Sequence, residues 1–187
     1  GAAIVAAIMI VGALFAPWLA PHQPFDLASL SLMDSLLPPA WLEQGQLKFF
    51  LGTDDQGRDV LSTILYGSRI SLLVGLASVA VAMVLGVGLG LLSGYVGGRV
   101  DAFIMRVADV MLSFPAILIA LLIDGSARAL LPRDAHSDWL AIGVLVGSIG
   151  LANWVQYART VRGSTLVEQG KAYVQAARVI GVKPWRI

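Results

Sequence analysis

The sequence predicts an all-α, polytopic membrane protein, and two observations carry that prediction. Apolar residues make up 57% of the 187 residues and charged residues only 13%, against about 45–50% and about 25% in soluble domains. Four stretches of the chain are also apolar and long enough to cross a bilayer, which takes about 20 helical residues. The net charge is only +1, so no nucleic-acid partner is expected.

The first predicted transmembrane helix is residues 1–20, which contain no charged side chain. Trp18 stands between Pro17 and Pro21, as expected where a helix reaches the membrane interface. A cleaved signal peptide is the alternative, but Trp18 occupies a position where signal peptidase needs a small residue. A membrane span is therefore the preferred interpretation.

Residues 21–50 are predicted to be an extracytoplasmic connection, because they are rich in proline and too polar to span. Residues 51–69 are predicted to form an amphipathic helix lying in the interface. Thr53 and Gln56 have the spacing of a capping box, followed by an apolar face. That face consists of Val60, Leu61, Ile64 and Leu65.

The remaining residues, 70–187, are predicted to form the membrane core, beginning with a second span at 71–94. Small residues recur in this span at every fourth position, which places them on one face of a helix: Ser78, Ala82, Gly86, Gly90 and Gly94. Such a seam lets another helix approach closely. The spacing does not indicate which helix that is.

A short hydrophilic turn at 95–106 precedes the predicted third span, residues 102–123. Pro115 is expected to kink this helix, because proline removes one backbone hydrogen bond. Asp109 lies one helical turn from Arg106, and the two are expected to form an interfacial ion pair.

The fourth span is predicted at 139–158, with Asn153 and Gln156 about one turn apart. Polar side chains at membrane depth face protein or water rather than lipid. Two interpretations stay open: these side chains contact another helix, or they line a candidate substrate path.

The segment 165–187 is predicted to be a polar knob built as helix, tight turn, helix. Residues 174–180 form a helical run centred on Ala176 and Ala177, and Gly181 suits the left-handed position that ends a helix. Pro184 suits the first position of a second helix.

Cation counts predict the orientation of the spans. Four spans place the connecting segments alternately on two sides of the membrane, with eight Lys and Arg residues on one side and five on the other. The positive-inside rule puts the first side in the cytoplasm. The knob at 165–187 lies on that side.

Two motifs resemble those of a known family. The run Gln175-Ala176-Ala177-x-x-x-Gly181 resembles the EAA coupling loop of ABC-importer permeases, with Gln175 at the glutamate position. Residues 51–72 resemble the Gly-Thr-Asp-x-x-Gly-Arg-Asp signature of the C-type permease subunit of dipeptide, oligopeptide and nickel importers. The resemblance implies the transmembrane domain of a type I ABC importer. Four of about six spans would lie in these residues, with the rest beyond Ile187.

The resemblance also implies a function in the bacterial cytoplasmic (inner) membrane. The protein would be a permease subunit that moves dipeptides or oligopeptides by alternating access. Its partners would be a homologous second permease, two ATP-binding cassette subunits, an extracytoplasmic binding protein and membrane lipid. The residues implied to contact the ATPases are Gln175, Ala176, Ala177, Gly181, Pro184 and Trp185.

No catalytic, cofactor-binding or metal-binding residue is predicted in this chain. The run Gln169-Gly-Lys-Ala172 lacks the first glycine and the hydroxyl residue of a P-loop. ATP and Mg²⁺ would therefore be bound by the partner subunits.

Two alternatives to peptide import stay open. One is an importer of the same kind for nickel, glutathione or another small solute, and the other is a helical channel or scaffold protein without ATPases. An intramembrane hydrolase would need a nucleophile and a base at membrane depth, and no such pair is evident.

Overall fold

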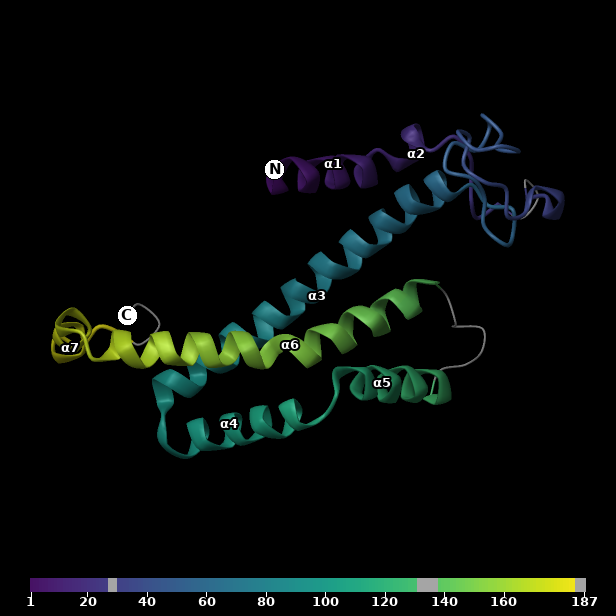
Figure 1. Ribbon diagram of the computed structural model, residues 1–187. Helices are drawn as coiled ribbons and strands as arrows, with labels where there is room; N and C mark the ends of the chain where they lie inside the picture. Colours follow the sequence, from purple (N-terminus) through teal and green to yellow (C-terminus); the bar gives the residue numbers. More distant parts are fainter. Residues whose placement is uncertain (27–29, 131–137, 184–187) are drawn as a thin grey trace. The chain divides into compact units, whose positions relative to one another are not determined.

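A computed structural model describes residues 1–26, 30–130 and 138–183 of the chain. These residues are helical or irregular, and their one β-type pairing is an isolated bridge between Thr53 and Asp59. The chain divides into two compact units, Gly1–Leu73 and Val74–Ile187. Helix α3 (Val60–Val96) begins in the first unit and ends in the second (Figure 1).

The first unit begins with two short helices rather than the single helix predicted at 1–20. Helix α1 (Ala2–Leu14) and the four-residue α2 (Ala16–Leu19) are separated at Phe15. Pro17 accounts for the break, because its ring nitrogen cannot donate to the carbonyl four residues earlier. With 13 residues, α1 is shorter than the about 20 residues that span a bilayer. A Cβ added to Gly12 would lie 3.3 Å from Leu65 Cδ2, so α1 packs against the start of α3.

The amphipathic helix predicted at residues 51–69 is wrong in its first half. Residues 51–59 form a closed turn, and α3 begins at Val60 and continues without a break through the predicted second span. Gly52 and Gly57 have φ angles of +81° and +76°, values that a helix does not allow. A Cβ at Gly52 would lie 2.4 Å from the Leu37 carbonyl oxygen. Both glycines therefore serve a turn packed against an earlier loop.

Side-chain hydrogen bonds explain why the capping-box interpretation of Thr53 and Gln56 is also wrong. The Thr53 hydroxyl accepts a hydrogen bond from the Leu37 N–H at 2.9 Å and donates one to the Asp34 carbonyl. Thr53 thus fastens the loop that contains the short 3-10 helix η2 (Leu32–Asp34) to the turn. The spacing indicated a helix cap, whereas the hydroxyl binds a segment 16 residues away.

Asp59 is the residue that caps α3. Its Oδ2 accepts hydrogen bonds from the Ser62 N–H at 3.0 Å and the Ser62 hydroxyl at 2.5 Å, and both residues are buried. This is the geometry of an N-cap side chain that satisfies a free helix N–H.

Within the turn at residues 51–59, burial raises the pKa of the Asp54 carboxyl. Hydrogen bonds from Arg58 and from the Gln56 N–H outweigh this effect and lower the pKa of Asp54 overall.

The described residues of the second unit contain the rest of α3 and four further helices: α4 (Gly98–Ser113), α5 (Ala116–Leu130), α6 (Asp138–Gln169) and α7 (Ala172–Val179). Helix α6 runs alongside α4 and α5 (Figure 1). The turn predicted at 95–106 is wrong, because only Gly97, with φ +66°, separates α3 from α4.

The third span predicted at 102–123 is broken rather than kinked. Helices α4 and α5 meet at Phe114 and Pro115 with a bend of 93°. Proline disfavours helical geometry in the residue before it, and Phe114 is extended, with φ −97° and ψ 132°. The fourth predicted span, in contrast, is longer than expected, because α6 continues beyond residue 158 to Gln169.

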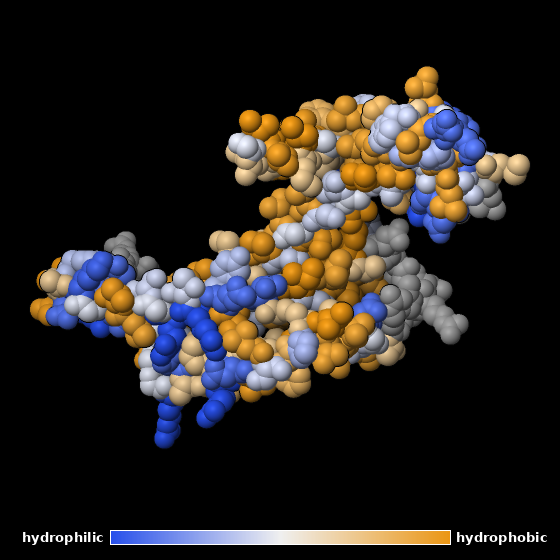
Figure 2. Space-filling view, viewed as in Figure 1, coloured by the Kyte–Doolittle hydropathy of each residue, from blue (hydrophilic) through white to orange (hydrophobic). Residues whose placement is uncertain are grey.

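Within the described residues, α3 and α6 are long and apolar enough to cross a membrane, and the bent pair α4–α5 would add a third crossing. The sequence predicted four. The core of the second unit joins α4 to α6 through Ile104, Ala108, Trp154, Val155 and Ala158. Figure 2 shows an apolar surface over most of α3 and α5, whereas hydrophilic residues gather near α7 and the start of α4.

Candidate functional site

The seam of small residues on α3 packs against α6. Ser78 and Ala82 are buried, and α6 lies close to each of the three glycines. A Cβ on Gly86 would lie 2.5 Å from Tyr157 Cβ, and one on Gly90 would lie 2.6 Å from the Ala158 carbonyl oxygen. Neither space admits a methyl group, so the partner helix that the sequence left open is α6.

Two acidic residues of α4 pair with two arginines of α6. Arg162 Nε and a terminal nitrogen contact the Asp101 carboxylate at 2.5 and 2.6 Å, and the Ser93 hydroxyl of α3 donates to the same carboxylate. Asp109 pairs with Arg159 at 2.6 Å. The predicted ion pair of Asp109 with Arg106 is therefore wrong. The Asp109 carboxylate pairs with an arginine of another helix instead.

Replacing Asp101 by asparagine is expected to destabilise the second unit by about 1–3 kcal/mol, because the half-buried Arg162 guanidinium loses its charged partner. Thermal unfolding of the purified protein in detergent measures this effect. Asp109→Asn is the matched control, since its ion pair is about half exposed, and such pairs contribute at most about 1 kcal/mol. Equal losses in the two variants would contradict a special role for Asp101.

Helix α7 is the first helix of the predicted knob and ends at Val179, and Gly181 adopts the predicted left-handed conformation two residues later. The glycine has φ +78°, its N–H donates to the Arg178 carbonyl, and the Val182 N–H donates to the Ala177 carbonyl. These two hydrogen bonds make a Schellman motif, which closes a helix by turning the chain sharply. Pro184 and Trp185 lie outside the described residues.

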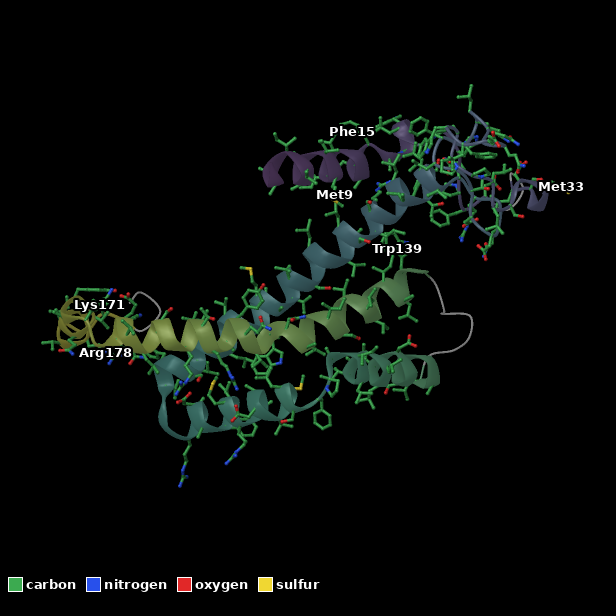
Figure 3. The ribbon with its side chains drawn as sticks, in the orientation of Figure 1. Met9, Phe15, Met33, Trp139, Lys171 and Arg178 are labelled. Atoms are coloured by element: carbon green, nitrogen blue, oxygen red, sulfur yellow. The ribbon has the colours of Figure 1, made fainter. Side chains whose placement is uncertain are left out.

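The exposed surface of α7 is mixed, because polar residues and large apolar residues both lie on it. Val174 is buried against the rest of the unit, whereas Val179 and Ile180 are 87% and 77% exposed. Gln175 and Ala176 are exposed as well, and Ala177 is half-buried. Lys171 and Arg178 lie at the α7 end of the unit, and Trp139 lies at the far end of α6 (Figure 3).

Polar contacts fix the junction between α6 and α7. The Glu168 carboxylate accepts hydrogen bonds from Lys171 Nζ and from the Tyr173 hydroxyl, both at 2.5 Å. These bonds raise the pKa of the Lys171 ammonium and the pKa of the Tyr173 hydroxyl. Both groups therefore keep their protons throughout the neutral range.

Asn153 and Gln156 lie on α6 beside a hollow of about 280 Å³ between α3 and α6. Asn153 Nδ2 donates to the Ile149 carbonyl of its own helix at 2.8 Å, and both side chains are exposed within this chain. This placement is compatible with a helix contact and with a substrate path, and both interpretations stay predictions.

Sequence reasoning missed the Asp101–Arg162 pair and the roles of Thr53 and Asp59. The only signal for the pair was the opposite charge of the two residues, because both lie in polar stretches with several other charged side chains. Their separation of 61 residues hid the contact. For Thr53 and Asp59, the glycines at positions 52 and 57 were the signal, because they favour a turn over a helix.

The apolar helices and the buried seam are those of a helical membrane protein, and comparison with known families gives the family. Residues 86–187 match the family described as "Binding-protein-dependent transport system inner membrane component". The chain belongs to this family, whose fold is the transmembrane domain of type I ABC importers.

Individual relatives match between 74% and 96% of this chain. It is 38% identical over 181 residues to the di/tripeptide transport system permease protein DppC of Pseudomonas aeruginosa, covering 96% of this chain and 55% of the relative. It is 42% identical over 184 residues to the dipeptide transport system permease protein DppC of Escherichia coli, with the same coverage. The glutathione transport system permease protein GsiD of Pectobacterium atrosepticum is 40% identical over 147 residues, 74% of this chain and 42% of the relative. The chain spans about half the length of the curated relatives it matches.

Proposed function

We propose that this chain is part of a permease subunit that imports dipeptides or oligopeptides across the bacterial cytoplasmic membrane. The energy comes from ATP hydrolysis by partner subunits, which bind the ATP and Mg²⁺. The permease works with a homologous second permease, two ATP-binding cassette subunits and an extracytoplasmic binding protein. Alternating access carries the peptide through the membrane.

The observation that carries this proposal is the shape and surface of α7. It is a short helix closed by the Gly181 turn, and it exposes apolar side chains at the cation-rich end of its unit. Exposed apolar side chains of this kind mark surfaces that another protein or a membrane covers. The positive-inside rule puts this end in the cytoplasm, where ATPase subunits would bind it through Gln175, Ala176, Ala177 and Gly181.

The names of the relatives support peptides as the substrate class. Two of them are named for dipeptide or di/tripeptide transport and one for glutathione, itself a tripeptide-like solute. Glutathione, nickel or another small solute remains the second candidate within the same machinery. Competition between labelled dipeptide and each of these solutes for uptake distinguishes the candidates.

Affinity purification of the full-length protein from native membranes in mild detergent tests the proposal. We expect a second permease and two ATPases carrying Walker motifs to purify with it, and proteoliposomes of that complex with its binding protein to take up dipeptide when ATP is supplied. A protein that purifies alone or as a homo-oligomer would contradict the proposal and favour the channel or scaffold alternative.

A further inference from the structure

Gln169, the last residue of α6, binds two other helices at once. Its Nε2 donates to the Gly94 carbonyl of α3 at 2.7 Å. Its Oε1 accepts a hydrogen bond from the Arg178 guanidinium of α7 at 3.0 Å. One half-buried side chain therefore connects the last turn of α3 to α7.

The contact on α3 satisfies a carbonyl that the helix itself leaves free. Gly94 lies within the last four residues of α3, whose carbonyls have no partner in their own helix. It also lies where α3 and α6 touch, since an added Cβ would be 2.7 Å from Thr165 Cβ. A displacement of the Gln169 side chain would thus be transmitted to the end of α3 through this hydrogen bond.

The hydrogen bond between Gln169 and Arg178 of α7 is charge-assisted, and Arg178 also makes a second contact. The Arg178 guanidinium lies over the Tyr95 ring, 5.4 Å from its centroid, at a distance typical of cation–π attraction. Arg178 therefore contacts α3 directly through Tyr95 and indirectly through Gln169. Both contacts end in the same turn of α3.

Packing alone does not fix the position of α7. A groove of about 640 Å³, lined in part by Tyr95, Gln169 and Val174, runs beside it. Two residues, Gly170 and Lys171, join α6 to α7. The ion pair of Glu168 with Lys171 connects the start of α7 to α6 and involves no residue of α3. The hydrogen bonds of Gln169 connect α7 to α3, in addition to the direct contact of Arg178 with Tyr95.

We infer that Gln169 is a positioning residue that passes a displacement of α7 to the cytoplasmic end of α3. This inference rests on the proposed function, in which partner ATPases move α7. The Arg178–Gln169–Gly94 chain of hydrogen bonds makes α7 and the end of α3 move together. Because α3 packs along α6 through the glycine seam, the movement then reaches the membrane-spanning part of the unit.

The test uses the full-length permease assembled with its partner subunits and binding protein in proteoliposomes, and it measures peptide uptake and ATP hydrolysis together. Gln169→Leu has a similar size but makes neither hydrogen bond. We expect it to keep its ATPase subunits and to hydrolyse ATP at a rate within about twofold of wild type. Its uptake per ATP should fall about tenfold, the equivalent of one lost charge-assisted hydrogen bond.

Two further variants separate the halves of the connection. Gln169→Glu can accept from Arg178 but cannot donate to the Gly94 carbonyl, whereas Gln169→Lys can donate but cannot accept. Both should lower uptake per ATP. Val167→Ala is the control, because Val167 is 67% exposed on the same turn of α6, and it should behave as wild type.

The outcomes separate this inference from the proposed function. Wild-type uptake per ATP in Gln169→Leu would overturn the inference and leave the proposed function standing. Loss of the ATPases from Gln169→Leu would also overturn it, because Gln169 would then serve docking rather than transmission. A wild-type permease that binds no ATPase would instead refute the proposed function, and the inference with it.

Discussion

Replacing Gly86 by alanine is expected to destabilise the packing of α3 against α6 by about 1–3 kcal/mol, the range for an extra carbon forced into a filled space. The new Cβ would lie 2.5 Å from Tyr157 Cβ and 2.6 Å from the Trp154 carbonyl oxygen. Because one of these contacts is with backbone, the helices must separate. Thermal unfolding in detergent, followed by the helical circular-dichroism signal, measures the loss.

Gly88→Ala is the matched control for this prediction. Gly88 lies in the same helix two residues away, and an added Cβ there meets no atom within 4 Å. Alanine is favoured over glycine inside a helix by about 0.5–1 kcal/mol, so this variant should be as stable as wild type or more so. Destabilisation of both variants to the same degree would contradict the claim that Gly86 lies in close contact with α6.

Replacing Gly181 by valine is expected to abolish transport while the membrane helices still fold. Among the described residues nothing lies within 4 Å of an added Cβ, so the expected effect comes from the backbone, whose φ is +78°. A β-branched residue held in that region is strained by about 1–3 kcal/mol. The strain opens the turn and displaces the chain that follows α7. Peptide uptake and the helical circular-dichroism signal test the two halves of the prediction.

Gly181→Asn provides the comparison, because asparagine tolerates the left-handed region better than other side chains. It should recover much of the uptake that valine loses. Normal uptake by the valine variant would refute the role of the turn. Loss of folding in the valine variant would show that Gly181 serves stability rather than coupling.

Apolar length and small-residue spacing were enough to predict the all-α class and the existence of the seam. Both depend on properties of a single helix, which a sequence displays directly. The identity of the partner helix was not predictable, because the contact between Gly86 and Tyr157 joins positions 71 residues apart in the numbering. The same holds for the pair of Asp101 and Arg162.

The predictions were wrong where a local sequence pattern is compatible with two different backbone structures. Thr53 and Gln56 fit a capping box, but the left-handed glycines at 52 and 57 required a turn, and the Thr53 hydroxyl had a distant backbone partner. Pro115 indicated a kink, but the size of the bend depends on how α4 and α5 each pack against α6. Gly181 was predictable because a helix end requires its conformation locally.

Cross-linking from α7 tests the central claim most directly. The 187 residues contain no cysteine, so Ala176→Cys places a single thiol in this part of the protein, at an exposed position on α7. A photoactivatable maleimide attached there, in native membranes, should cross-link the permease to a protein that carries Walker motifs. Trp139→Cys, at the other end of α6 and also exposed, should give no such product. A cross-link to lipid alone from Ala176→Cys, or to the same ATPase from both positions, would contradict the assignment of α7 as the ATPase-coupling surface.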